Sequence, residues 1–180
     1  MITLKQILFE ISEDESKRLL DKIKNKDYTF FARGDNGKVY SLNNEDLLFK
    51  ITNEPDEVDV ANVIVGRAGE FSSFIPIHYT NQKNMYIMSK ASSLNNVYKQ
   101  QFNDFINRFK QYQRETGGEV NIFDFLDNDG GRETDYKVVN FLRSLQQDIR
   151  KIQIEGLAED LDFKLDNIMM YNGNLVMIDW

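Results

Sequence analysis

The 180-residue chain has no cysteine, one histidine, two prolines and no long run of apolar residues. The lack of cysteine excludes disulfides and thiolate metal sites, and a single histidine argues against a transition-metal centre. No stretch approaches the roughly 18 consecutive apolar residues of a membrane span. We therefore expect a soluble, unexported, cytoplasmic protein with no membrane partner.

Positive charge is also scarce, because 22 Lys and Arg residues face 29 Asp and Glu residues, which gives a formal net charge of -7. Proteins that bind nucleic acid concentrate Lys and Arg to neutralise phosphates. The sequence therefore predicts no nucleic-acid partner. Its length and its 41% hydrophobic composition allow one substantial core or two small lobes.

The first half is rich in short β-prone runs. A capping box at Ser12 and Glu15 predicts an N-terminal helix. Residues 28–52 contain FFA, KVYSL and LLFKIT, separated by the turn-forming GDNG and NNED, and predict an antiparallel meander. Pro55 begins an apolar helical pattern that continues to Gly69, and the runs FIPIHYT and NMYIMSK predict two further strands.

The second half is mainly helical in pattern. Aromatic residues from Tyr98 to Tyr112 mark one face of a long helix that fades at Gly117, and a second long helix follows. The runs NIMMY and LVMID are joined by NGN, which is typical of a type I′ hairpin. The joint SKASSLNN at 89–96 separates the halves, so the sequence predicts an α+β protein with units at 1–91 and 92–180.

A cluster of polar residues before and after the last hairpin can support phosphoryl transfer. Asp162, Lys164 and Asn167 have the spacing D-x-K-x-x-N, and Asp179 follows after an apolar strand. Phosphoryl transfer needs a carboxylate for the attacking hydroxyl, oxygen ligands for magnesium and a cation for the phosphate. The alternative is that an acidic, Asn-rich chain places such residues in turns by chance.

This spacing resembles the catalytic loop H-R-D-x-K-x-x-N of the protein-kinase-like superfamily, in which the Asp of D-F-G follows a hairpin. The resemblance implies Asp162 as catalytic base, Lys164 on the γ-phosphate, Asn167 and Asp179 on Mg²⁺, and ATP as phosphoryl donor. It also implies a protein-kinase-like two-lobed fold. The N-terminal helix and an N-lobe of a five-stranded antiparallel sheet plus helix would occupy 1–91, and a reduced, mainly helical C-lobe with the catalytic loop would occupy 92–180.

Two features of the first half extend the resemblance. Residues 32–40, ARGDNGKVY, resemble the nucleotide-covering loop G-x-G-x-x-G-x-V with Ala at the first Gly, which implies Gly34, Gly37 and Val39 beside the nucleotide. An ordinary hairpin turn is the alternative. Lys50 resembles the V-A-I-K lysine that holds the α- and β-phosphates, and a lone ammonium in the apolar run LLFKIT would be costly without a partner. The alternative is a strand-edge lysine with its charge in solvent.

The acid that pairs with Lys50 is open among Glu57, Asp59 and Glu70. We prefer Glu57, because Glu70 lies past Gly66 and Gly69, where the helix is expected to end. Acids in the first turn of a helix are also favoured by its dipole, which is an alternative explanation for Glu57 and Asp59.

Met88 resembles the residue that guards the adenine pocket, with Ser89 and Ala91 in the hinge backbone that would bind adenine. Other candidate sites are weaker. The run DNDGG at 127–131 lacks the spacing of a calcium loop and is expected to be a turn. His78 has no nucleophile or second histidine in a catalytic arrangement around it and is expected to be structural.

The resemblance stops at Asp179-Trp180, where Trp180 stands in place of the Phe of D-F-G, and Asp160-Leu161 replace His-Arg before the catalytic Asp. It therefore implies a truncated lobe without control by loop phosphorylation. A truncated lobe would expose apolar surface, so self-association into a homo-oligomer is a hypothesis. The small size and the Asn- and Lys-rich composition suggest a phage or other viral protein, which would act in the host cytoplasm.

Three functional hypotheses follow. The first is an active minimal kinase that transfers the γ-phosphoryl of Mg-ATP to a hydroxyl of an unknown protein or small-molecule acceptor. The second is a catalytically inactive, pseudokinase-like binding or regulatory module. The third is an unrelated α+β interaction protein, which predicts that Lys50 and Asp179 lie far apart, whereas a kinase site requires both beside one cleft.

Overall fold

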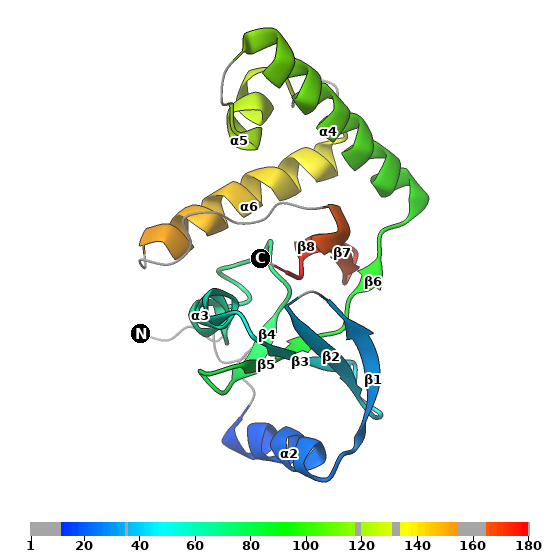
Figure 1. Ribbon diagram of the computed structural model, residues 1–180, viewed down its shortest axis with the longest axis vertical. Helices are drawn as coiled ribbons and strands as arrows, with labels where there is room; N and C mark the ends of the chain where they lie inside the picture. The colour runs from blue at the N-terminus through cyan, green and yellow to red at the C-terminus, as the bar shows by residue number, and fades with distance from the viewer. Residues whose placement is uncertain (1–11, 35, 118–119, 131–133, 155–164, 180) are drawn as a thin grey trace.

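The computed structural model describes residues 12–34, 36–117, 120–130, 134–154 and 165–179. The first half forms a five-stranded antiparallel sheet with one helix packed on each face, and the second half is mainly helical (Figure 1). The predicted α+β class, with a five-stranded antiparallel sheet plus helix followed by a mainly helical part, is confirmed. None of the helices among these residues is long and apolar enough to cross a bilayer.

The sheet has the strand order β1-β2-β3-β5-β4. Its strands are β1 (Tyr28–Arg33), β2 (Gly37–Leu42), β3 (Leu47–Thr52), β4 (Ile77–Thr80) and β5 (Met85–Ser89). In the centre of the sheet, Lys50 of β3 is directly opposite Val39 of β2 and Tyr86 of β5. Because successive side chains in a strand point to opposite faces, Val39, Lys50 and Tyr86 share one face. The neighbouring residues Phe49 and Ile87 therefore point to the other face.

The face that carries Phe49 is covered by α2 (Glu13–Lys24). Ser12 caps this helix by accepting a hydrogen bond from the backbone N–H of Glu15 (3.2 Å), as expected. The carboxylate of Glu15 binds Arg18 instead of reaching back to the start of the helix, so only half of the predicted capping box forms. Leu19 is fully buried against the sheet and joins α2 to the cluster around Phe49.

The face that carries Lys50 is covered by α3 (Pro55–Ile64) and by the second half of the chain. Pro55 lies in the first turn, as expected. The prediction that the helix continues to Gly69 is wrong, because α3 ends at Ile64 and Gly66 adopts a positive φ of 69°. Such a backbone conformation ends a helix and is most favourable for glycine. The chain then crosses to β4 through an irregular loop.

The second half begins with β6 and ends with the β7–β8 hairpin. Its elements are β6 (Ser92–Ser93), α4 (Asn96–Thr116), α5 (Ile122–Phe125), the π-helical η1 (Leu126–Gly130), α6 (Tyr136–Ile154), the 3-10 helix η2 (Leu165–Asn167), β7 (Ile168–Tyr171) and β8 (Asn174–Met177). At the hairpin tip Asn172 and Gly173 both have positive φ, 49° and 79°, as the predicted type I′ turn requires. We expected a turn at 127–131. The described residues of this run, 127–130, instead belong to the π-helical segment η1.

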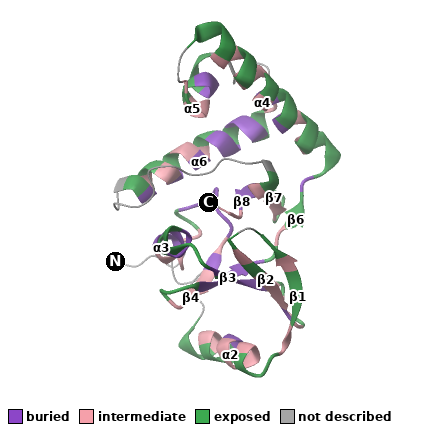
Figure 2. Cartoon of the chain, in the orientation of Figure 1, coloured by how far each residue is buried: buried purple, intermediate pink, exposed green. Residues whose placement is uncertain are grey.

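The two halves share one hydrophobic core. Buried residues in α6, β8 and the sheet belong to a single cluster, and β8 lies between α6 and the sheet (Figure 2). The backbone N–H of Met177 in β8 donates to Ser73 O (2.7 Å), and Met177 O accepts from Ile75 N (2.9 Å). These bonds fix the end of β8, and hence the segment that carries Asp179, against the loop before β4.

Candidate functional site

Lys50 is the centre of a buried cluster of charges. Its side chain is only 6% exposed, and its Nζ contacts Oε1 of Glu57 and lies 2.8 Å from Oδ1 of Asp179. The three residues come from β3, from α3 and from the segment after β8. Burying an ammonium without partners is costly, so both carboxylates stabilise Lys50 in this position.

Glu57 is buried as deeply as Lys50. Its side chain is 2% exposed, and its Oε1 also accepts a hydrogen bond from the Tyr86 hydroxyl (2.6 Å). Burial raises the pKa of Glu57 above its ordinary value, and hydrogen bonding to Lys50 opposes that rise. Burial and the nearby Glu57 charge likewise raise the pKa of Tyr86. The face of the sheet under α3 thus holds the Lys50 cation between a buried acid, Glu57, and a more accessible one, Asp179.

The structure distinguishes among the three acids considered as partners of Lys50. Glu57 contacts Lys50 directly, because it lies in the first turn of α3 above the centre of β3. Asp59 is exposed two residues further along α3. Glu70 lies beyond the end of the helix, where its carboxylate binds Arg67 at 3.0 Å.

The β7–β8 hairpin brings Asn167 and Asp179 together. Ile168 pairs with Met177 in the hairpin, and the N–H of Ile178 donates to Asn167 O (2.8 Å). The two residues therefore lie side by side at the open end of the hairpin. The Asp179 side chain is 43% exposed, so its carboxylate combines contact with Lys50 and access to solvent.

Asp162 and Lys164, the predicted catalytic base and γ-phosphate ligand, lie outside the described residues. Within the described part of the chain, no three His, Cys, Asp or Glu residues are grouped closely enough to hold a metal ion. Asn167 and Asp179 instead offer an amide and a carboxylate. Such oxygen donors fit Mg²⁺, which commonly takes one or two protein ligands and completes its shell with water and substrate phosphates.

The glycines of the predicted nucleotide-covering loop have a structural explanation as well. The N–H of Gly34 donates to Gly37 O (3.0 Å), and Asn36 O accepts from Asn53 N (2.9 Å), which ties the loop to the end of β3. A Cβ on Gly37 would lie 2.3 Å from Ile51 O, so close strand packing alone requires glycine there. At Gly34 no atom lies within 4 Å of a built Cβ.

The predicted adenine-pocket residues lie at the end of β5. Met88 is buried on the same face as Lys50 and is opposite Leu48 of β3. The backbone N–H of Ser89 donates to Pro76 O (3.0 Å), so it is already used within the protein. Ala91 is half-buried against the shared core, between β5 and β6.

A hydrogen-bonded network of side chains around His78 was not predicted. His78 Nε2 lies 2.8 Å from Ser89 Oγ, and the Ser89 hydroxyl donates to the Tyr171 hydroxyl (3.2 Å). Burial lowers the pKa of His78, which favours the neutral ring. This network joins β4 and β5 to β7, so His78 contributes to the contact between the two halves of the protein.

Asp148 is a second group that sequence reasoning missed. It is 2% exposed and accepts hydrogen bonds from the backbone N–H (3.0 Å) and hydroxyl (2.7 Å) of Ser73, while Lys151 binds its other oxygen at 2.7 Å. The available signal was an acid on the apolar stripe of α6, between Leu145 and Ile152. The contact anchors α6 to the loop that also holds β8.

No protein-family model matches the chain, and no curated protein matches it significantly. Among solved structures it is similar to the streptomycin–ATP–APH(2")-IIa ternary complex, with 15% sequence identity and a TM-score of 0.38 over 99% of this chain and 71% of that chain. A TM-score this low does not establish a shared fold.

Proposed function

We propose that the chain is a kinase-like phosphotransferase, which moves the γ-phosphoryl group of Mg-ATP to a hydroxyl of a protein or small-molecule acceptor. The observation that carries the proposal is the contact between Lys50 and Asp179, residues 129 positions apart (2.8 Å). An unrelated interaction protein does not require these two residues to meet. The sequence resemblance assigns them neighbouring roles in one cleft.

Lys50 is suited to bind phosphate oxygens. Glu57, which accepts a hydrogen bond from the Tyr86 hydroxyl, fixes the position of Lys50 from the buried side, and the Lys50 ammonium reaches the more exposed Asp179 on the other. A cation held in place before the ligand arrives loses little conformational freedom on binding. In the proposal, Lys50 holds the α- and β-phosphates and Glu57 keeps it oriented.

Asn167 and Asp179 are the proposed Mg²⁺ ligands. When bound, Mg-ATP would supply the transferable phosphoryl group and a metal charge that neutralises it. Asp162 as base and Lys164 on the γ-phosphate remain proposals that rest on their spacing to Asn167. Gly34, Gly37 and Val39 would cover the phosphates, and Val39 supports this role because it shares the face of Lys50.

Adenine would lie beside Met88. Because the N–H of Ser89 is bonded to Pro76, a backbone donor to the adenine ring would have to come from further along, which favours Ala91. The carbonyl groups of this connection are the corresponding acceptors. These contacts come from the backbone, so side-chain substitutions at Ser89 and Ala91 should affect binding less than substitution of Lys50.

The same ion pair favours a second candidate, a nucleotide-binding module without turnover. Lys50 and Asp179 neutralise each other in the described arrangement, and a bound Mg-nucleotide has to separate them. If the separation does not produce the arrangement needed for transfer, binding occurs without chemistry. Binding and turnover are therefore measured separately.

Thermal unfolding with and without Mg-ATP tests the binding step. A ligand at 100 times its dissociation constant stabilises the folded state by about 2.7 kcal/mol. We expect a rise in Tm for the wild type and for Lys17→Met, an exposed lysine on α2, which covers the opposite face of the sheet, but not for Lys50→Met or Asp179→Asn. Asp179 is partly exposed, so its variant should fold even if Lys50→Met does not. An unchanged wild-type Tm at millimolar nucleotide would contradict the proposal.

Turnover is then measured as phosphate release or autophosphorylation in wild type and Asp162→Ala. We expect loss of activity in Asp162→Ala with binding retained. Equal activity in both proteins would exclude Asp162 as the base. Binding without activity in the wild type would select the non-catalytic module.

A further inference from the structure

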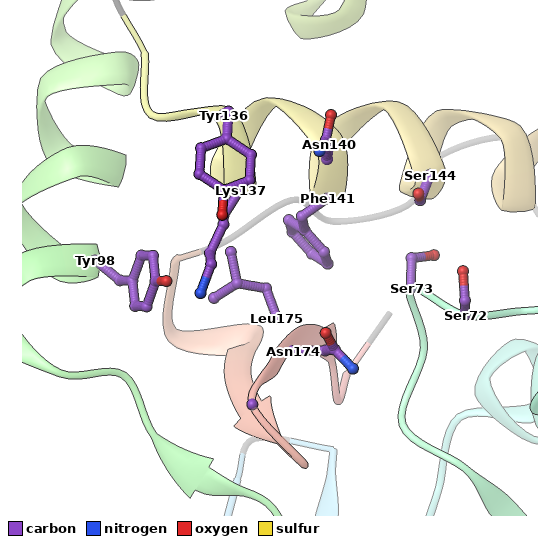
Figure 3. Close-up of a pocket in the computed structure, with 11 residues that line it drawn as sticks. Ser72, Ser73, Tyr98, Tyr136, Lys137, Asn140, Phe141, Ser144, Asn174 and Leu175 are labelled. Atoms are coloured by element: carbon purple, nitrogen blue, oxygen red, sulfur yellow. The ribbon is translucent and has the colours of Figure 1, made fainter.

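A pocket of about 410 Å³ lies between α6, the start of α4, the β7–β8 turn and the loop before β4 (Figure 3). Its lining includes Tyr98, Lys137, Asn140, Phe141, Asn174 and Leu175. Pockets that bind small molecules typically measure about 300–1,000 Å³ and combine apolar walls with a few convergent polar groups. This pocket has both properties, and none of its lining residues belongs to the proposed nucleotide site.

Lys137 gives the pocket its charge. It is the one charged side chain among the described residues that line the pocket, in a chain whose net charge is -7. Within the described part of the chain Lys137 forms no ion pair. Asp135 is the acid whose charge helps to raise the pKa of Lys137, and its carboxylate accepts a hydrogen bond from the backbone N–H of Lys137 (2.8 Å). Lys137 is also exposed, so its ammonium is accessible to a ligand.

The Tyr98 hydroxyl faces the Lys137 ammonium in the pocket (Figure 3). The proximity of Tyr98 is the main cause that raises the pKa of Lys137 above its ordinary value. In Figure 3 the two side chains extend toward each other from α4 and α6. Because a tyrosine hydroxyl accepts one hydrogen bond and can donate another, Tyr98 can bind the ligand atom that Lys137 attracts.

The other walls are suited to the uncharged part of a ligand. Phe141 and Leu175 are 6% and 7% exposed and form an apolar surface beside Lys137. Asn140 and Asn174 add amide groups from α6 and from the hairpin. The ring of Tyr136 is 67% exposed at the edge, where it can cover a bound molecule.

We propose that this pocket binds a small organic oxyanion, a carboxylate or phosphate ester attached to an apolar ring. Its charged end lies at Lys137 and Tyr98, and its ring lies on Phe141 and Leu175. Carboxylates and phosphate esters share the charge and the hydrogen-bond acceptors that this pair of residues recognises.

NMR titration of the full chain tests the proposal with three small probes. Benzoate and phenyl phosphate represent the two oxyanions, and benzamide is the neutral counterpart of benzoate with nearly the same shape. For probes of this size, dissociation constants of about 1 mM are measurable with ligand up to about 10 mM. We expect saturable shifts of the backbone amides of Lys137, Asn140 and Asn174 with one or both anions.

The variant Lys137→Met keeps the length of the side chain and removes its charge. We expect affinity for the anions to fall by about tenfold or more in this variant, to be unchanged in Lys110→Met, and to be about tenfold lower for benzamide than for benzoate. Preference for benzoate or for phenyl phosphate identifies the oxyanion. Absence of saturable shifts, equal binding of benzamide, or unchanged binding by Lys137→Met would each overturn the proposal. The measurement needs no nucleotide, so its result is independent of the proposed kinase activity.

Discussion

The two faces of the five-stranded sheet are built from the same strands but differ in chemistry. The face under α2 is apolar and aromatic, with Leu19 against Phe49, and the Phe49 and Tyr40 rings stacked with centroids 4.9 Å apart. The face under α3 carries Lys50, Glu57 and the Tyr86 hydroxyl at equally deep burial. Alternation along β3 alone separates the two, because Phe49 and Lys50 are adjacent in sequence.

The two faces of the sheet are expected to contribute differently to stability and to binding. Burial of apolar and aromatic side chains stabilises the fold directly, whereas burial of an ion pair contributes little net stability and is often replaceable by apolar residues without loss. A domain that needed only stability would be served by apolar residues on both faces. The charged face is therefore the side of the sheet on which we propose that the nucleotide binds.

Removal of an aromatic ring from the α2 face should have the largest effect on stability. Phe49→Ala deletes a ring that is 1% exposed and should lower the free energy of unfolding by about 3–5 kcal/mol. The stability gained from Mg-ATP should be unchanged in the folded fraction, because the ring points away from Lys50. Urea unfolding with and without nucleotide measures both. A variant that folds but gains nothing from Mg-ATP would show that the two faces are not independent.

Glu57→Gln should weaken the response to nucleotide, which Phe49→Ala leaves intact. Because burial raises the pKa of Glu57 in the folded protein, its contribution to stability is full below its ordinary pKa of 4.5 and is lost as pH rises through the raised value. Glutamine cannot ionise, so the variant should lack this pH dependence, but it leaves Lys50 without its buried counter-charge and should therefore be less stable than wild type at neutral pH. Its gain from Mg-ATP, about 2.7 kcal/mol in wild type at 100 times the dissociation constant, should fall because Lys50 loses its buried partner. Tm measured against pH with and without nucleotide decides the matter. A variant that keeps the full nucleotide response would refute the proposed role of Glu57.

The smallest effect is expected for Glu45, which forms partly exposed ion pairs with Arg18 and Lys22 on the α2 side of the sheet. Arg18 and Lys22 hold the pKa of Glu45 down at about 2. A lowered pKa in the folded state contributes stability that is present above the ordinary value and lost as pH falls toward 2. Because the pair is near solvent, Glu45→Gln should cost about 0–1 kcal/mol at neutral pH and nothing at high salt. Urea unfolding at low and high salt checks this. A larger, salt-independent loss of stability would mean that charged groups contribute equally to stability on both faces of the sheet.

Much of the fold could be predicted because its signals are local. The strand meander, the end of α4 at Gly117 with its positive φ of 64°, and the Asn172-Gly173 turn depend on residues close together in sequence. The end of α3 was placed too late, since the apolar pattern continues through Ala68 while the positive φ of Gly66 ends the helix. Periodicity reports which side chains can be buried, and backbone conformation decides where the helix stops.

The candidate site was less predictable because it depends on distant contacts. Spacing placed Glu57 near Lys50, but sequence alone does not distinguish it from Asp59 on the same helix. The need for glycine at position 37 follows from Ile51 O on the neighbouring strand, which only the strand register reveals. The pairing of Asp148 with Ser73 has no sequence signal beyond an acid on an apolar stripe.

The Lys50–Asp179 ion pair also bears on how the protein folds. Contacts between residues 129 positions apart form slowly, because the chain must lose the entropy of closing a long loop before they stabilise it. The sheet and its helices can assemble from local contacts first, whereas the two charges meet only when β8 has docked. A nucleotide whose binding needs both charges would then bind the fully folded protein and would bind few partly folded chains.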